Sequence, residues 1–217
     1  MSDSGSLRTL SRRRFNGLAA ASAGALALGG ALAMPAAPGR AAPVGPDGLH
    51  IQPWFLQSFL ILKEDLAEAD NAGKRLAVIW ELEGCPYCRE MHAVNFMRPE
   101  IVDYIKANFS VVQLNFIGAR TVTDFDGEEL PEKKLAEKWG VRFTPTIQFF
   151  PRGRDLKAGT PGHKAEVARM PGYLKPFHFL SMFQYVKEEA YAREKFGAYM
   201  KGRLTKLKKS GKTPESW

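Results

Sequence analysis

Cysteine and histidine are scarce in this sequence, whose 217 residues include only two cysteines and four histidines. Two cysteines are too few for a scaffold held together by several disulfides. They also leave a structural zinc site two ligands short, because no second cysteine pair exists and the histidines are scattered. Those histidines are His50, His92, His163 and His178. We therefore expect the chemistry at the cysteine pair itself, Cys85 and Cys88.

Other features are missing as well. Internal repeats are absent, and after residue 34 no run is long and apolar enough to cross a bilayer. Groove-reading motifs are lacking, which argues against a nucleic-acid partner. The chain is otherwise typical of a globular protein, with 45% hydrophobic and 25% charged residues, and it carries a formal net charge of +8. Residues 197–217 form a basic C-terminal tail, either a solvated helix end or a surface for an anionic partner.

Residues 1–42 have the organisation of an export signal. Ser11-Arg12-Arg13-Arg14-Phe15 is similar to the twin-arginine motif, an uncharged stretch from Gly17 to Met34 follows, and small residues around Ala41 suit a signal peptidase. A membrane anchor is the alternative, but the stretch is marginal in length and weakly hydrophobic for a span. We expect export by the twin-arginine pathway to a bacterial periplasm, with residues 43–52 as a linker.

Helix-like and strand-like patterns alternate over the rest of the chain. The expected helices cover residues 53–72, 85–96, 99–108, 131–139 and 176–196. The expected strands cover residues 76–82, 110–117, 146–150 and 165–170. This alternation predicts one α/β domain over residues 53–196, with a sheet covered on both faces, an extra N-terminal helix and a long C-terminal helix.

The sequence Cys85-Pro86-Tyr87-Cys88 lies where a strand gives way to a helix. Unpaired N–H groups and the helix dipole stabilise an anion there, so the position favours a thiolate, which is the nucleophilic form of cysteine. Pro86 suits the first helical position because it has no N–H to leave unpaired. We expect Cys85 to attack a target sulfur and Cys88, nearly one turn further and deeper, to resolve the mixed disulfide without any metal or organic cofactor.

Other roles for the cysteine pair remain open. A purely structural disulfide would close too small a loop to stabilise the fold much. A Cu(I) metallochaperone is a further alternative, because the soft ligands Met91 and Met97 and the imidazole of His92 follow the pair. Methionines at helical spacing also commonly pack against a sheet. The same dithiol could equally act as an oxidase that installs disulfides, since the direction depends on which redox form is more stable.

From about residue 53 to 190 the chain resembles the thioredoxin superfamily. The resemblance rests on the apolar strand 76–82, the Cys-Pro-Tyr-Cys helix start, the strand 110–117, and Thr144-Pro145-Thr146 before a strand. It implies a thioredoxin-like fold with a central mixed sheet and thiol–disulfide oxidoreductase activity.

The resemblance also assigns roles to individual residues. Pro145 would be cis and would face the active-site disulfide, and the backbone of Thr144 would pair with a substrate chain. Pro86 and Tyr87 would complete the surface that contacts the substrate. One departure concerns Ile79, which occupies the position where thioredoxins usually carry a buried aspartate. Glu81 and Glu83 lie nearby, and we expect both to be solvated.

Within the superfamily, three stretches are similar to the periplasmic SoxW subgroup of sulfur-oxidation systems. These stretches are Val122–Gly127, Trp139–Thr146 and Met170–Pro176. The similarity implies a protein disulfide substrate near a SoxYZ-like sulfur carrier and a membrane electron donor of the CcdA/DsbD type. We also expect the protein to act as a monomer.

Overall fold

The computed structural model describes residues 42–215. Residues 1–41, which hold the expected export signal, and residues 216–217 lie outside the described part. Within residues 42–215 no helix combines the length and the apolar character that a membrane span requires.

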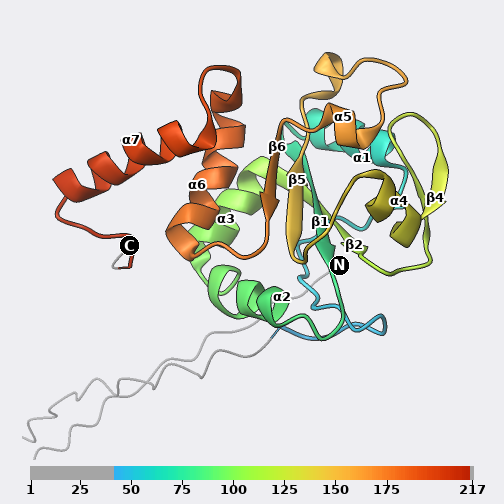
Figure 1. The fold of residues 1–217 in the computed structure, drawn as a ribbon, viewed down its shortest axis with the longest axis horizontal. Coiled ribbons are helices and arrows are strands. Elements are labelled where there is room, and N and C mark those ends of the chain that lie inside the picture. Colours follow the sequence, from blue (N-terminus) through green and yellow to red (C-terminus); the bar gives the residue numbers. More distant parts are fainter. Residues whose placement is uncertain (1–41, 216–217) are drawn as a thin grey trace, which may run out of the picture. The chain divides into compact units, whose positions relative to one another are not determined.

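A four-stranded mixed sheet forms the centre of the domain (Figure 1), in the order β2-β1-β5-β6. Its strands are β1 (Arg75–Glu81), β2 (Phe109–Asn115), β5 (Thr146–Phe149) and β6 (Ala168–Pro171). The β1–β2 pair is parallel, whereas β5 runs antiparallel to both β1 and β6. Two short strands, β3 (Thr121–Thr123) and β4 (Glu129–Pro131), make a separate antiparallel pair. The mixed thioredoxin-like sheet implied by the resemblance is therefore confirmed.

Side chains of β1 alternate between two apolar cores, because successive residues of a strand point to opposite faces. Ala77 and Ile79 belong to one core, and Val78 and Trp80 belong to the other. The first core is covered by α2 (Pro86–Glu90), the π-helical segment η1 (Met91–Asn95), α3 (Pro99–Asn108) and α6 (Pro176–Lys187). The second core is covered by α1 (Leu62–Asn71) and α4 (Glu132–Lys138). Helices on both faces explain why β1 is buried along its whole length.

The first helix begins later than the spacing predicts. The expected helix over residues 53–72 is wrong in its first half, because α1 starts at Leu62. Before it the chain runs beside β2, where the Leu56 N–H donates to the Val111 carbonyl at 2.8 Å. Leu60 then adopts a positive φ of 63°, which a continuous helix does not allow. Helical spacing would place Phe59 on one face with Phe55 and Leu62, but without the helix its side chain is exposed.

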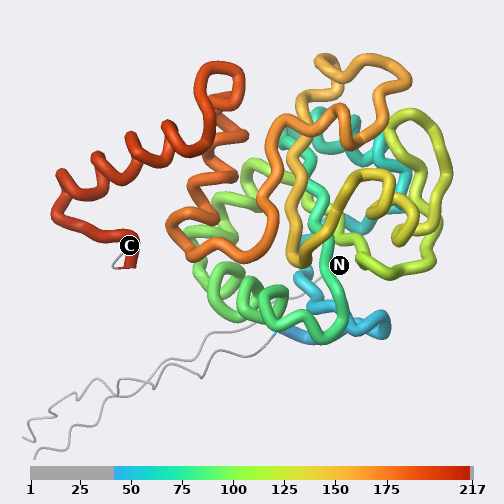
Figure 2. The backbone as a smooth tube through the Cα atoms, viewed as in Figure 1, coloured from blue at the N-terminus to red at the C-terminus, as the bar shows by residue number. Residues whose placement is uncertain are grey.

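Residues 43–52 do not behave as a free linker. They form a tight hairpin in which Val44 and His50 make an antiparallel bridge and the Ile51 N–H donates to the Pro43 carbonyl at 2.7 Å. Gly48 at its tip has a φ of +76°, and a Cβ there would lie 2.5 Å from Glu83 Cγ. The hairpin therefore packs directly on the segment before Cys85, as the blue and green tubes show (Figure 2).

The C-terminal region contains two helices where one was expected. The helix expected over residues 176–196 ends at Lys187, and Glu189 has a φ of 52°, which reverses the chain. After the turn η3 (Ala190–Ala192), helix α7 (Phe196–Lys209) takes up most of the expected basic tail. Met200 and Leu207 anchor α7 by packing with Phe177. The remaining short elements are η2 (Gly153–Asp155) and α5 (Gly162–Ala165).

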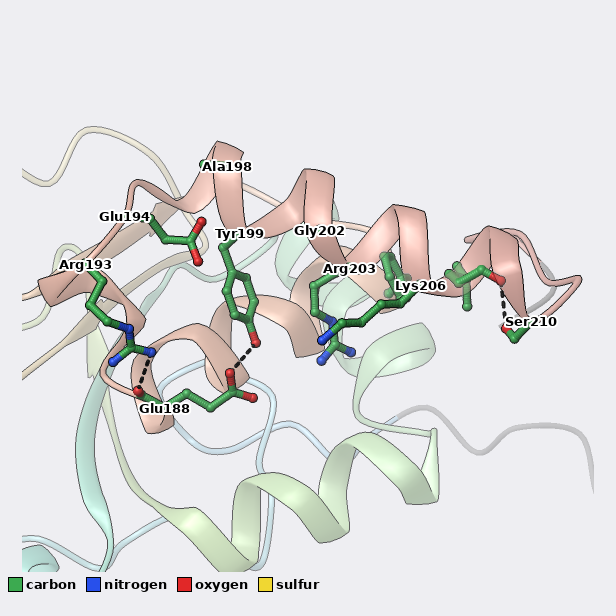
Figure 3. Close-up of a pocket in the computed structure, with 11 residues that line it drawn as sticks. Glu188, Arg193, Glu194, Ala198, Tyr199, Gly202, Arg203, Lys206 and Ser210 are labelled. Atoms are coloured by element: carbon green, nitrogen blue, oxygen red, sulfur yellow. Dashed lines mark hydrogen bonds between the residues drawn. The ribbon is translucent and has the colours of Figure 1, made fainter.

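A pocket of about 530 Å³ lies between α6 and α7 (Figure 3). Its lining carries both signs of charge, including Glu188, Arg193 and Arg203. Within it the Tyr199 hydroxyl donates to Glu188 Oε2 at 3.1 Å. None of the residues expected in the redox site lines this pocket.

Asp65 on α1 makes the stability of the folded protein depend on pH. Burial raises the pKa of its carboxyl to about 6, although the Ser58 hydroxyl donates a hydrogen bond to it. The folded state binds this proton more tightly than the unfolded chain, so stability falls as pH rises from about 4 to about 6 and stays lower above. Asp65→Asn is expected to stabilise the protein by about 1–3 kcal/mol at pH 7. Urea unfolding at about pH 7 and pH 4 should show this gain only at the higher pH; an equal gain at both would contradict it.

Candidate functional site

Cys85 and Cys88 meet at the start of the helix that follows β1. Their sulfurs form a disulfide, with the Cα atoms 5.3 Å apart. Cys85 caps α2, its Sγ accepts a hydrogen bond from the Cys88 N–H at 3.1 Å, and Pro86 occupies the first helical turn. Cys85 is 8% exposed and Cys88 is 1% exposed. A thiolate at Cys85 would thus accept from a free helical N–H, and Cys88 lies below it.

Thr144, the residue before Pro145, lies against the sulfur of Cys85. The Thr144–Pro145 peptide is cis, as the resemblance implies. The antiparallel pairing of Trp80 with Thr146 places the start of β5 beside the end of β1, and this brings the two segments together. The Thr144 hydroxyl donates to Cys85 Sγ at 3.4 Å, and the Thr144 carbonyl oxygen lies 3.4 Å from the same sulfur. A Cys85 thiol could donate to that carbonyl in the reduced protein.

The surface around Cys85 offers contacts for a partner. Tyr87 is 61% exposed beside the disulfide, and the aromatic ring of Phe143, two residues before Pro145, is exposed as well. On the other side of Cys85, a pocket of about 370 Å³ is lined by the hairpin residue His50 and by Arg89. Exposed aromatic side chains beside a reactive group are typical of protein contact sites.

Glu81 corrects one of our expectations, because it is buried rather than solvated. Glu81 is 0% exposed and His92 is 1% exposed, and His92 Nε2 lies 2.8 Å from Glu81 Oε1. Glu81 stands two residues after Ile79, on the face of β1 that the Cys-x-x-Cys helix covers. A buried carboxylate is therefore present, displaced by two residues along the same face. Glu83, by contrast, is exposed as expected.

The structure does not gather the soft ligands that suggested copper. Met91 is buried in the core, whereas Met97 is exposed. Both ring nitrogens of His92 are engaged, Nδ1 with Gln52 and Nε2 with Glu81. Among residues 42–215 no three His, Cys, Asp or Glu side chains form a group that could hold a metal ion.

A cysteine pair that caps a helix opposite a cis-proline, on a mixed sheet with helices on both faces, defines a protein of the thioredoxin fold with a redox-type dithiol. The family model described as "Thioredoxin-like domain" matches residues 62–187, more than half of the chain. The chain belongs to the thioredoxin-like domain family.

Several solved structures are similar to this chain. A thioredoxin-fold protein from Helicobacter pylori is 20% identical, with a TM-score of 0.50, and the match covers 61% of this chain and 86% of that protein. A thioredoxin from Thermus thermophilus is 28% identical over 58% of this chain and 83% of its own, with a TM-score of 0.43. The C-terminal domain of Neisseria meningitidis DsbD is 15% identical over 55% and 86%, with a TM-score of 0.37. The comparison with curated proteins gives no match.

Sequence reasoning missed two residues of the site, Gln52 and His92. Gln52 lies in the segment interpreted as a linker, and His92 was considered only as a metal ligand. One signal was available: His92 is four residues after Cys88, so both side chains share a helix face, and that face meets β1. β1 offers an acidic partner for a buried imidazole on that face, because Glu81 is the one acidic residue of the strand.

Proposed function

We propose that this protein is a periplasmic thiol–disulfide oxidoreductase that reduces disulfides or sulfur-conjugated cysteines on a partner protein. The observation that carries the proposal is the position of Cys85, which caps a helix and accepts a hydrogen bond from Thr144, the residue before the cis Pro145. The Cys85 thiolate attacks the target sulfur, and the electrons of that sulfur–sulfur bond leave with the target's thiolate. The thiol of Cys88 then loses its proton and attacks Cys85 Sγ, which releases the partner's second sulfur and forms the Cys85–Cys88 disulfide.

The partner is expected to dock on the surface that surrounds Cys85. Pro86 and Tyr87 are exposed beside the disulfide, and Thr144 contacts Cys85 Sγ. We expect an extended substrate segment to lie against these residues and to pair with the Thr144 backbone. A SoxYZ-like carrier of a sulfur-oxidation system is the partner we propose. Electrons would arrive from a membrane donor of the CcdA/DsbD type, and the protein would act as a monomer.

The export signal supports the proposed location. Residues 1–42 carry the twin arginines and the apolar stretch in the order that the twin-arginine pathway uses. A periplasmic dithiol needs an electron source from across the membrane, because the periplasm is kept oxidising. This location therefore fits the proposed donor.

Insulin reduction by dithiothreitol tests the proposal. The protein without residues 1–42 is expected to shorten the lag before insulin B chains precipitate, and to remove sulfur bound to the cysteine of a SoxYZ-like carrier. Absence of both activities would refute the reductase assignment. Oxidation of reduced, unfolded proteins without insulin reduction would select the oxidase, and stoichiometric Cu(I) binding without thiol exchange would select the metallochaperone.

A further inference from the structure

A buried carboxylate–imidazole pair lies under the Cys-x-x-Cys helix and has no role in the exchange steps described above. The pair consists of Glu81 at the end of β1 and His92 in η1. Both side chains are almost completely buried, and each makes hydrogen bonds to further polar side chains. Burial of a charged group is costly unless it is paired, so the charge state of this pair affects whatever chemistry takes place nearby.

Gln52 fixes which nitrogen of His92 carries the proton. The Trp54 indole N–H can only donate, and it donates to Gln52 Oε1 at 3.1 Å. The other end of the Gln52 amide, Nε2, is therefore the end that faces His92 Nδ1, at 3.0 Å. Since an amide NH₂ donates, Nδ1 accepts and bears no proton. The proton of the neutral imidazole then resides on Nε2, from which it is donated to Glu81.

Glu81 is consequently ionised and the pair carries one negative charge. Its Oε1 accepts from His92, and its Oε2 accepts from Gln113 Nε2 at 3.0 Å. Gln113 is itself oriented, because the same nitrogen donates to the His50 carbonyl at 2.8 Å. A carboxyl group that accepts at both oxygens is in its acceptor-only, ionised form. The imidazole that neighbours it is neutral, so nothing within the pair cancels this charge.

The pair lies close to both cysteines along the chain. The Cys85 N–H donates to the Leu82 carbonyl at 3.2 Å, so the backbone turns immediately after Glu81. His92 follows Cys88 by four residues, which places the two side chains on one face of the helix. Gln52 reaches the pair from the hairpin segment 43–52, which lies outside the part of the chain that matches the family.

We propose that the Glu81–His92 pair, held in this state by Gln52, lowers the reduction potential of the Cys85–Cys88 couple and so favours electron donation. Reduction converts the neutral disulfide, with two electrons and one proton, into a Cys85 thiolate and a Cys88 thiol. A fixed negative charge in a poorly polarisable interior opposes the new anion and therefore stabilises the oxidised form. Glu81, His92 and Gln52 are positioning residues in this account. The inference deepens the proposed reductase function and rests on it for its biological meaning.

The first test removes the charge. Glu81→Gln is expected to shift the equilibrium with a dithiothreitol redox buffer about tenfold toward the dithiol, a rise of about 30 mV for this two-electron couple. The measurement is made at about pH 8, where histidine side chains are ordinarily neutral. Asp65→Asn is the matched control, because it removes another buried carboxylate from α1, on the other face of the sheet. The reduction potential of the Asp65→Asn variant is expected to equal that of the wild-type protein.

The second test asks whether Gln52 acts through Glu81. Gln52→Met removes the donor that keeps His92 Nδ1 unprotonated. The imidazole can then take a proton at Nδ1, either as a second proton or by turning a bare Nε2 toward a protonated Glu81. These two states lack the net charge, so the potential is expected to rise as they become populated. The double variant Gln52→Met/Glu81→Gln should then shift no further than Glu81→Gln alone. Additive shifts would overturn the role of Gln52.

Nitrogen-15 NMR of wild-type His92 tests the tautomer without any variant. The expected spectrum shows a protonated Nε2 and an unprotonated Nδ1 at about pH 8, whereas a protonated Nδ1 would overturn the inference. An unchanged potential in a folded Glu81→Gln protein would overturn it too. If the Glu81→Gln protein fails to fold, the inference is tested by the reduction potential of the Gln52→Met variant and by the NMR spectrum of the wild-type protein. Because a potential needs no partner, a failed insulin assay with the expected shift would refute the proposed function and leave this inference intact.

Discussion

Exchange of Cys88 for serine is expected to give a protein that attacks disulfides and then stops. Cys85 keeps its place at the helix start, so it still forms the mixed disulfide, but no second thiol remains to release the partner. Cys85→Ser removes the nucleophile itself. Each variant is expected to lose insulin reductase activity by more than about a thousandfold, because residues that act as a unit fail together.

The two variants are expected to differ in whether they form a covalent complex with a partner protein. After incubation with a SoxYZ-like carrier, Cys88→Ser should migrate on a non-reducing gel as a covalent complex that dithiothreitol dissolves. Cys85→Ser should give no complex, because Cys88 is buried. Met97→Ser is a suitable control, since Met97 is exposed on the same segment and is expected to leave both results at the wild-type level. A complex formed by Cys85→Ser but not by Cys88→Ser would reverse the assigned roles.

Lys138→Met is expected to destabilise the fold by about 3–5 kcal/mol, because it leaves a buried carboxylate without its cation. Lys138 Nζ lies 2.6 Å from the Asp124 carboxylate and 2.8 Å from both Asp126 and Glu128. Burial alone would lower the pKa of Lys138, but its hydrogen bonds to the three carboxylates outweigh burial and raise it. Asp124 is the buried member, and it also accepts from the Trp139 indole.

Urea unfolding measures this effect, with Lys134→Met as the matched control. Lys134 is on the same helix and also pairs with a carboxylate, Glu137 at 2.8 Å, but both side chains are exposed. Exposed pairs of this kind contribute about 0–1 kcal/mol. Similar losses in the two variants would show that the three-carboxylate cluster around Lys138 contributes no more than a surface ion pair.

The helix-start position of the cysteine pair and the strands of the sheet could be predicted from sequence, because both depend on local patterns. The apolar run of β1 has the composition of a strand covered on both faces, and Cys85-Pro86 has the features of a helix start. That the segment of Thr144 and Pro145 faces the disulfide was implied by resemblance alone, since 59 residues separate the hydrogen-bonded pair Thr144 and Cys85. Local patterns carry no information on that distance.

The failures share a physical cause, which is that tertiary contacts overrode local signals. Residues 53–61 have helical spacing but instead bond to β2 through Leu56. Glu81 was expected to be solvated because a carboxylate is rarely buried without a partner, and its partner His92 lies on another element. The helix break at Glu189 has no glycine or proline to announce it, and Arg75 on β1 holds that residue through an ion pair.

Of the two cysteines, Cys85 is expected to be the nucleophile. Limited alkylation of the fully reduced protein with iodoacetamide near neutral pH, followed by peptide mass spectrometry, distinguishes Cys85 from Cys88. We expect label on Cys85 while Cys88 stays almost unmodified until the protein is unfolded, because Cys85 is the more accessible of the two, at 8% against 1%, and lies at the helix start. Equal labelling of both cysteines, or faster labelling of Cys88, would contradict the account.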